Sequence, residues 1–324
     1  MIFDSFGRQL RYLRISVTDR CNLRCVYCRP EAGVRLYPHG EILSYEEIER
    51  VARVAVGLGM DSLRITGGEP LVRKDICHLV ERLSRIEGLA DLSLTTNGLL
   101  LGELAGPLRA AGLWRVNISL DTMDRERFAR LTRGGEIGQA LAGLGAALAA
   151  GLEPVKLNVV LFAEAEGQPT AADILAFAEM SRSLPVHVRF IEWMPLNGQR
   201  QAGDPAAERV WRILAGLAEL QQTPGPQGNG PARYFRYEGA AGTVGFITPQ
   251  SAPFCDRCSR LRLTSTGKLK LCLLQEQELD LREPLRGGAD DEQLAALFRQ
   301  AAQNKPAGYP KEIAELASMC QIGG

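Results

Sequence analysis

Residues 12–28 of this 324-residue chain read YLRISVTDRCNLRCVYC, a strand-like run that leads directly into a loop with three cysteines. The β-branched and aromatic residues of 12–17 predict a buried strand. In β/α barrels catalytic groups gather at the carboxyl ends of strands, where this loop lies. The stretch therefore predicts both the start of a β/α fold and the position of its active site.

Beyond this stretch, strand-like and helical patterns alternate through the first 195 residues. Strands are predicted at 12–17, 62–66, 91–95, 115–119, 155–160 and 187–191. Helices are predicted at 44–57, 75–86, 102–111, 124–131, 138–150 and 171–183. This alternation predicts an α/β fold with a parallel sheet and helices on its outside. Six units fall short of the eight of a closed barrel, so we expect a partial (incomplete) (β/α)6 TIM-type barrel over residues 1–195.

The composition changes after residue 195. Residues 196–232 are expected to form a linker region, because 221–231 is rich in Pro, Gly and Gln and has no periodicity. Residues 233–324 are expected to form a small C-terminal module with a tail. Its predicted elements are strands at 233–237, 243–247, 260–264 and 268–271 and a helix at 290–302.

Charge and targeting signals restrict the function classes. The chain has 38 Lys and Arg against 38 Asp and Glu, so its net charge of zero argues against non-specific nucleic-acid binding. Neither a signal-peptide pattern nor a run of about 18 apolar residues is present, which predicts a cytoplasmic chain without a membrane partner. In a reducing compartment the eight cysteines favour metal binding or chemistry over disulfides.

The first cysteine cluster is Cys21, Cys25 and Cys28. Three thiolates this close can hold three corners of an iron–sulfur cubane, and their spacing differs from the four-cysteine ferredoxin runs. One iron then lacks a nearby protein ligand, and an open position is what a catalytic metal needs. A zinc knuckle or coincidental cysteines remain the alternative.

The second predicted strand ends in Gly67-Gly68-Glu69-Pro70. Two glycines allow a ligand to approach the backbone closely, and Glu69 can accept from an ammonium group. An empty turn is the alternative. Small polar residues follow the third and fourth strands, at Thr95-Thr96-Asn97-Gly98 and around Ser119. They could contact ribose and carboxylate groups of a ligand, and strand-end capping is the alternative.

Together, Cys-x3-Cys-x2-Cys with Tyr27 before the last cysteine and the Gly-Gly-Glu-Pro turn resemble the radical S-adenosylmethionine (SAM) family. The resemblance implies a [4Fe-4S] cluster held by Cys21, Cys25 and Cys28, with SAM on the open iron. No side chain is then the catalyst, because the radical comes from SAM. The SAM contacts that the resemblance implies are Tyr27, Gly68, Ser119 and Met194. Glu69 of the turn is added to them as a fifth predicted contact.

A second cluster of cysteines comprises Cys255, Cys258 and Cys272. Three cysteines again leave a ligand position open, whereas a zinc ribbon would need a second Cys-x2-Cys pair. A zinc-stabilised module completed from elsewhere in the chain is the alternative. The remaining thiols, Cys77 and Cys320, are more typical of buried or incidental cysteines.

Several predicted strands carry a cation where a structural design would place an aliphatic residue. Arg260 and Arg262 alternate on one strand and so point to the same face. Strands one, two, five and six carry Arg14, Arg64, Lys156 and Arg189. We interpret these cations as an interior lining for a polyanionic substrate.

These features together resemble the GTP 3′,8-cyclase family, the A proteins of molybdenum-cofactor biosynthesis. The match covers residues 13–20, 64–70 and 94–98, the second cysteine module and the terminal Gly323-Gly324. It implies a lyase with two [4Fe-4S] clusters that cyclises GTP to (8S)-3′,8-cyclo-7,8-dihydroguanosine 5′-triphosphate, with guanine on the second cluster. The implied substrate contacts are Arg14, Arg64, Thr95, Lys156, Arg189, Arg260 and Arg262.

The resemblance also implies partners: a homodimer, a reductant such as flavodoxin or ferredoxin, and cyclic pyranopterin monophosphate synthase as recipient of the product. Two alternatives remain open at this point. One is another radical SAM enzyme with an auxiliary cluster, such as a peptide maturase. The other is a non-catalytic iron–sulfur redox sensor.

Overall fold

The computed structural model describes residues 1–162, 168–194, 206–308 and 319–323. The described strands form one twelve-stranded sheet in the order β12-β11-β10-β1-β2-β3-β4-β5-β6-β9-β8-β7. From β10 to β9 every neighbouring pair is parallel. These parallel strands are β10 (Arg260–Leu263), β1 (Tyr12–Ser16), β2 (Ser62–Thr66), β3 (Asp91–Thr96), β4 (Arg115–Ser119), β5 (Val155–Leu161), β6 (Val186–Glu192) and β9 (Thr243–Ile247).

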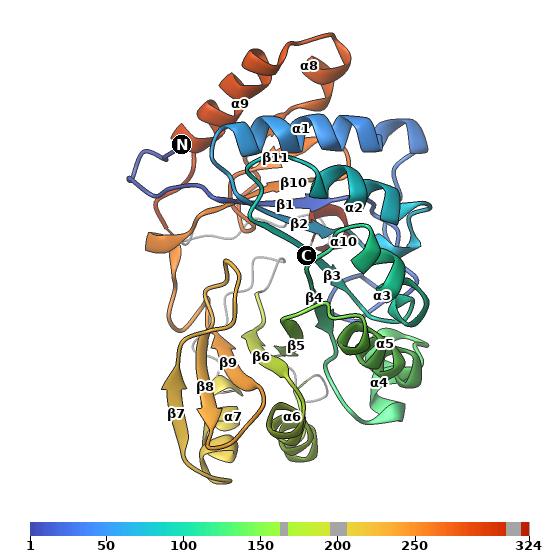
Figure 1. Cartoon of the computed structure of the whole chain (residues 1–324), viewed down its shortest axis with the longest axis vertical. Coiled ribbons are helices and arrows are strands. Elements are labelled where there is room, and N and C mark those ends of the chain that lie inside the picture. The colour runs from blue at the N-terminus through green and yellow to red at the C-terminus, as the bar shows by residue number, and fades with distance from the viewer. Residues whose placement is uncertain (163–167, 195–205, 309–318, 324) are drawn as a thin grey trace.

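Antiparallel strands extend both edges of the parallel part. On one edge β11 (Lys268–Lys270) and β12 (Glu278–Asp280) follow β10. On the other edge β8 (Arg233–Tyr237) and β7 (Leu220–Thr223) follow β9. In Figure 1 these two edges lie at opposite ends of the molecule, so the strand order describes an open, curved sheet.

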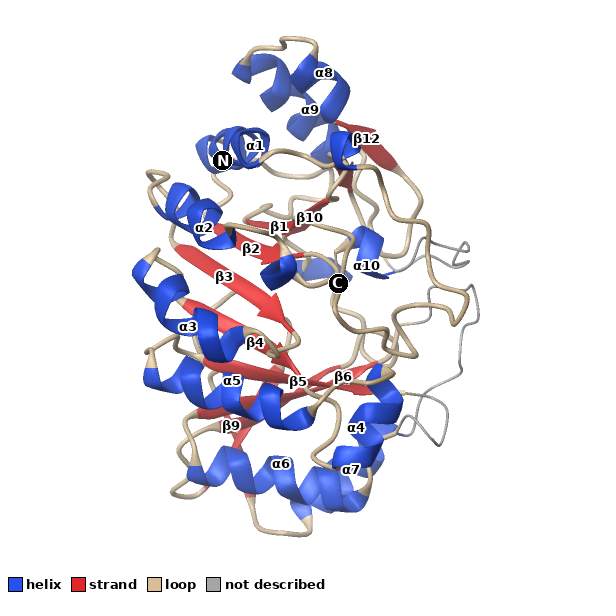
Figure 2. Ribbon diagram, turned by 90° about the vertical axis from the view of Figure 1, so that its right-hand side faces the viewer, coloured by secondary structure: helices blue, strands red, loops and turns tan. Residues whose placement is uncertain are grey.

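Helices cover the convex face of the sheet, as Figure 2 shows for α2, α3, α5 and α6. The helices of the β/α units are α1 (Tyr45–Gly57), α2 (Ile76–Ser84), α3 (Leu101–Ala110), α4 (Arg125–Thr132), α5 (Ile137–Ala149) and α6 (Ala171–Ser183). The later helices are α7 (Ala206–Ala215), α8 (Arg282–Arg286), α9 (Asp291–Gln303) and α10 (Met319–Ile322). None of the described helices has the length and apolar character needed to cross a bilayer.

Local chemistry explains where the main helices begin. Ser44 and Glu47 form a capping box at the start of α1. Thr170 begins α6 and Asp290 begins α9 in the same way. Each box satisfies two backbone donors that would otherwise lack partners, which fixes the helix start.

The predicted β/α alternation is confirmed, since all six strands and all six helices form within two residues of their predicted bounds. The strands of the predicted C-terminal module join the same sheet as the β/α units. Strand β10 pairs with β1 and β9 pairs with β6, both in parallel, so residues 233–271 complete the edges of the same sheet. The reason is that β1 and β6 would otherwise leave unpaired edges beside the site.

The predicted linker is also more ordered than its composition suggests. It contains α7 and β7, while 196–205 lies outside the described residues. Helix α7 buries Val210 and Leu214, and Trp211 packs edge-on against Phe235 of β8 at 4.7 Å between ring centroids. These tertiary contacts order a segment whose own sequence signal is weak. The predicted boundaries at 195 and 232 remain a prediction.

Candidate active site

A cavity of about 300 Å³ lies at the carboxyl ends of the parallel strands. Its lining brings together residues predicted as ligands of the first cluster and of SAM: Cys21, Cys25, Cys28, Tyr27, Gly68, Glu69, Ser119 and Met194. It also contains all but one of the predicted substrate contacts: Arg14, Arg64, Thr95, Arg189, Arg260 and Arg262.

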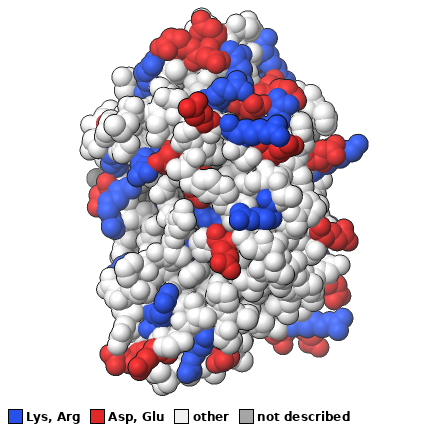
Figure 3. Space-filling view, in the orientation of Figure 1, with Lys and Arg blue, Asp and Glu red and all other residues white. Residues whose placement is uncertain are grey.

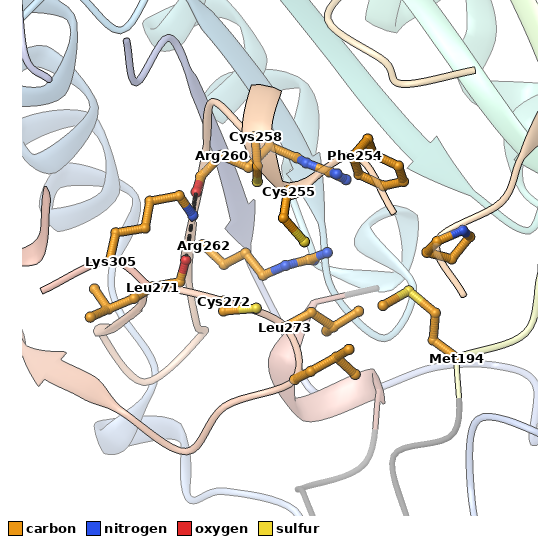
Figure 4. Close-up of a pocket in the computed structure, with 12 residues that line it drawn as sticks. Met194, Phe254, Cys255, Cys258, Arg260, Arg262, Leu271, Cys272, Leu273 and Lys305 are labelled. Atoms are coloured by element: carbon orange, nitrogen blue, oxygen red, sulfur yellow. Dashed lines mark hydrogen bonds between the residues drawn. The ribbon is translucent and has the colours of Figure 1, made fainter. Parts of the chain in front are cut away.

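The three second-cluster cysteines line an adjoining cavity of about 90 Å³, shown in Figure 4. Met194, Phe254, Arg260 and Arg262 belong to the linings of both cavities. The two cysteine groups therefore open onto one continuous space, with arginines between them. This joint arrangement could not be deduced from the spacing of either motif alone.

The first cysteine loop is fixed by backbone contacts with the end of α4. Arg24 N donates to Thr132 O at 3.1 Å, and Val26 N donates to Leu131 O at 2.9 Å. Burial raises the pKa of the Cys25 thiol to about 12 and contributes to raised pKa values of Cys21 and Cys28. Thiolates in such surroundings need positive charge beside them, and the iron ions that they would ligate in a cluster provide it.

The donor set fits a cluster rather than a mononuclear site. In the described part of the chain no three Cys, His, Asp or Glu side chains converge as ligands of one metal ion would. Ligands of a four-iron cluster bind different irons, so their sulfur atoms need not meet at one point. Three cysteines in each group would leave one iron of a bound cluster free for SAM or substrate.

Glu69 joins the ends of β2 and β3. Its carboxylate accepts from Leu71 N at 3.0 Å, from Thr96 Oγ1 at 2.8 Å and from Asn97 N at 2.7 Å. The side chain is buried, and burial raises the pKa of Glu69 to about 7. The structure thus gives Glu69 a scaffolding role in the turn, in addition to the SAM contact predicted from the sequence.

This burial predicts a pH-dependent stability difference. The unfolded pKa of Glu is about 4.3, so the folded state favours the protonated form, and this stabilisation is lost as pH rises through 7. Relative to Glu69→Gln, the wild-type apoprotein should lose up to about 3 kcal/mol of unfolding free energy between pH 4.5 and 7.5. Urea unfolding at several pH values measures this difference, and a constant difference would contradict the assignment.

Gly68 is required by close packing between two backbones. Its N–H donates to Thr18 O at 2.7 Å, and a Cβ on Gly68 would lie 2.3 Å from the carbonyl oxygen of Arg20. A backbone oxygen cannot rotate away, so we expect Gly68→Ala to cost about 2 kcal/mol of stability and to weaken SAM binding. Urea unfolding and SAM titration test this expectation. Gly102→Ala, on an open helical surface, is the control and should be neutral or slightly stabilising.

Asp121 is a site residue that the sequence did not single out for a role. Tyr27 Oη donates to Asp121 Oδ2 at 2.9 Å, and Val160 N donates to Oδ1 at 2.8 Å. Burial raises the pKa of Asp121 to about 6. This hydrogen bond holds the Tyr27 side chain in place, so Asp121, just after β4, positions a predicted SAM contact in the loop after β1.

Arginines form the wall between the two cysteine groups. Arg64, Arg189 and Arg262 are buried, and burial together with neighbouring arginines lowers the pKa of each, to about 9 for Arg64. Figure 3 shows that charges of both signs are interspersed on one outer face, in contrast to this wall. Buried cations that repel one another favour binding of an anion, because a buried charge is costly unless it is paired.

Two predicted substrate contacts have unfilled hydrogen-bonding capacity. The buried Oγ1 of Thr95 and Nε of Arg189 have no partner within the ranges that the structure describes. Arg189 does donate from Nη2 to Asn117 and Asn158, at 2.8 and 2.5 Å. Buried polar atoms without partners are rare, so these two favour a polar ligand in the cavity.

Lys156 is placed differently from the other predicted substrate contacts. Its buried Nζ donates to Gln227 O at 2.6 Å and does not belong to the cavity lining. Gly228 allows this approach, since a Cβ there would lie 3.1 Å from Lys156 Nζ and 2.6 Å from Arg115 Nη2. Lys156 and Arg115, which pairs with Asp91, thus lie beneath the 227–231 loop.

The second cysteine group is held around η3 (Cys255–Arg257) and the end of β11. Burial raises the pKa of Cys258, but Arg260 and Lys305 outweigh it and lower the pKa to about 7. Lys305 is close to the cysteines in Figure 4 and was not predicted from the sequence. Asn304 and Pro306, on either side of Lys305, belong to no recognisable motif. Only the structure therefore shows that Lys305 lies beside the cysteines.

The C-terminal tail also reaches this wall. Arg262 Nη1 donates to Gly323 O at 2.8 Å, and a Cβ on Gly323 would lie 2.8 Å from Ser16 Cβ. The Gly323-Gly324 ending noted in the sequence therefore places its first glycine beside the cavity. Gly324 lies outside the described residues.

Comparisons with known proteins agree with this geometry. Residues 15–168 match the radical SAM superfamily model, and residues 186–311 match the model described as Molybdenum Cofactor Synthesis C. Proteins named GTP 3′,8-cyclase from Moorella thermoacetica and Pelotomaculum thermopropionicum are each 50% identical, over 99% of this chain and 99% of theirs. The one from Heliobacterium modesticaldum is 50% identical over 94% of this chain and 93% of its own.

Solved structures support the fold. Streptococcus suis SuiB bound to S-adenosylmethionine superimposes with a TM-score of 0.59 at 16% identity, covering 90% of this chain and 68% of that one. At this identity the likeness concerns the fold alone.

Proposed function

Because this chain belongs to the GTP 3′,8-cyclase family of radical SAM enzymes, we propose that it cyclises GTP to (8S)-3′,8-cyclo-7,8-dihydroguanosine 5′-triphosphate in the first step of molybdenum-cofactor biosynthesis. Membership of the radical SAM superfamily implies a [4Fe-4S] cluster and SAM. The observation that carries the proposal is the pair of adjoining cavities, each lined by one three-cysteine group, that share Arg260 and Arg262 in their linings.

The roles of the residues follow from their positions. Cys21, Cys25 and Cys28 would hold the first cluster, which when bound supplies the electron that cleaves SAM. Gly68, Ser119 and Met194 would contact SAM beside it, together with Tyr27 and Glu69.

The second cluster and the substrate would occupy the other end of the space. Cys255, Cys258 and Cys272 would hold that cluster, which when bound would supply an iron for the guanine of GTP. The triphosphate would bind to the cationic wall and compensate its charge. The substrate contacts in this proposal are Arg14, Arg64, Thr95, Arg189, Arg260 and Arg262, with Lys156 joining them once its ammonium leaves Gln227 O.

The protein contributes orientation and exclusion of water. Reacting groups that are held in a cavity and shielded from water are protected from side reactions, which matters most for a radical. A homodimer, a flavodoxin or ferredoxin reductant and delivery of product to cyclic pyranopterin monophosphate synthase complete the proposal.

One anaerobic experiment tests the reaction. The protein is reconstituted with iron and sulfide and incubated with SAM, dithionite and GTP deuterated at C3′. Mass spectrometry should find deuterium in 5′-deoxyadenosine and a cyclised GTP isomer. Deoxyadenosine without deuterium would keep the radical SAM class but discard hydrogen abstraction from C3′ of GTP. A fully clustered protein that forms no deoxyadenosine would favour the redox-sensor alternative.

A further inference from the structure

Lys305 connects the two chain segments that carry the second group of cysteines. Its side chain enters between them just after α9 and is only 4% exposed. Lys305 Nζ donates to Arg260 O at 2.9 Å and to Leu271 O at 2.7 Å (Figure 4). Arg260 follows Cys258 by two residues, and Leu271 directly precedes Cys272. One ammonium group thus fixes the separation of two of the three cysteines.

Arg8 fixes the backbone from which Lys305 extends. Its guanidinium donates to Pro306 O at 2.6 Å and, through Nη1, to Ala307 O at 2.9 Å and Cys255 O at 2.6 Å. Asp4 accepts from Arg8 Nε at 2.5 Å and so holds the guanidinium in place. The third cysteine is therefore tied to the segment after Lys305, and all three cysteines depend on these two buried cations.

The charge of Lys305 lacks a carboxylate partner. No Asp or Glu forms an ion pair with Lys305 among the residues that the structure describes. The opposite charges that act on it are those of Cys258 and Cys272. A buried ammonium is costly unless paired, so its natural partner is the anionic cluster that thiolates would hold there.

We propose that Lys305 is a positioning residue for the second cluster: it holds the Cys258 and Cys272 segments at the spacing that the cluster needs, and its charge raises the cluster's reduction potential. Reduction adds a negative charge, which a nearby ammonium stabilises. Outer contacts of this kind tune metal affinity as well as potential. The inference rests on the second cluster of the proposed function.

The test isolates the second cluster. In a parent protein in which Cys21, Cys25 and Cys28 are all alanine, only the second group can bind iron. After anaerobic reconstitution, iron and sulfide are counted per chain, and the midpoint potential is measured by a redox titration followed by electron paramagnetic resonance. The variants are Lys305→Gln, which keeps a donor without the charge, Lys305→Met and Lys305→Arg.

A matched control is Lys270→Met. Lys270 is also buried, lies on β11 and faces Glu278 at 3.8 Å, but it does not belong to the lining of the cysteine cavity. Loss of this lysine removes a buried charge from the chain segment next to Leu271 but leaves both hydrogen bonds of Lys305 in place.

We expect Lys305→Gln to lower the ratio of reduced to oxidised cluster about tenfold at a fixed potential, equal to about 59 mV for one electron. Lys305→Met should also lose iron, whereas Lys305→Arg and Lys270→Met should keep both potential and iron near the parent. An unchanged potential in Lys305→Gln, or an equal shift in Lys270→Met, would overturn the role of Lys305. A parent that binds no iron would instead refute the second cluster of the proposed function.

Discussion

Cys25→Ala is expected to abolish reductive cleavage of SAM. Loss of an outer contact to a metal site costs roughly 10–100-fold, and loss of a ligand should cost more than about 1,000-fold. Cys25 lies in the middle of the first group and faces the shared cavity, so no neighbouring thiol of that loop replaces it. The measurement is 5′-deoxyadenosine formed per chain under anaerobic conditions with dithionite.

The control for this variant is Cys77→Ala. Cys77 is a half-buried thiol on α2, outside the cavity lining, and its loss should leave SAM cleavage unchanged. Iron content should fall in Cys25→Ala by about the amount that one cluster contributes. Deoxyadenosine at the wild-type rate from Cys25→Ala would refute the assignment of the first cluster.

Arg262→Ala is expected to reduce kcat/KM for GTP by about 100- to 1,000-fold while leaving both clusters assembled. Arg262 is buried, belongs to both cavity linings and is surrounded by Arg14 and Arg260, which together with burial lower its pKa. Removing one partner of a buried, hydrogen-bonded charge pair costs 2–5 kcal/mol, which corresponds to this range.

Two comparisons separate substrate binding from general charge effects. Arg257→Ala removes a highly exposed cation that lies between Cys255 and Cys258 and should have little effect. Arg262→Lys keeps the charge but loses the planar fork, so it should recover activity only in part. Unchanged GTP affinity in Arg262→Ala would remove Arg262 from the substrate site.

The sequence predicted the parts of the fold that depend on local signals. The strand patterns, their alternation with helices and the two cysteine spacings all correspond to elements or groups in the structure. What the sequence could not provide is the pairing of distant strands. Nothing local to β10 indicates that it lies beside β1, because parallel pairing carries no turn signature.

The missed site residues have a common physical reason. Lys305 and Asp121 are charged groups that the fold buries, and their environment depends on contacts from several elements. A single charged residue in a sequence is usually solvated, so only its burial marks it as functional. Lys156 was predicted as a substrate contact, and its position on a strand is confirmed. The sequence did not indicate that the 227–231 loop covers its side chain.

The pairing of β1 with β10 has a consequence for synthesis on the ribosome. Tyr12 of β1 pairs with Arg260 of β10, so this strand pairing cannot form until most of the chain has been translated. At 5–20 residues per second this delay is roughly 10–50 s, during which the edge of β1 and the cysteine loop beyond it remain uncovered. Arg260 and Arg262 of β10 belong to the lining of the cavity around Cys21, Cys25 and Cys28, and we therefore expect this cavity to be completed only late in synthesis.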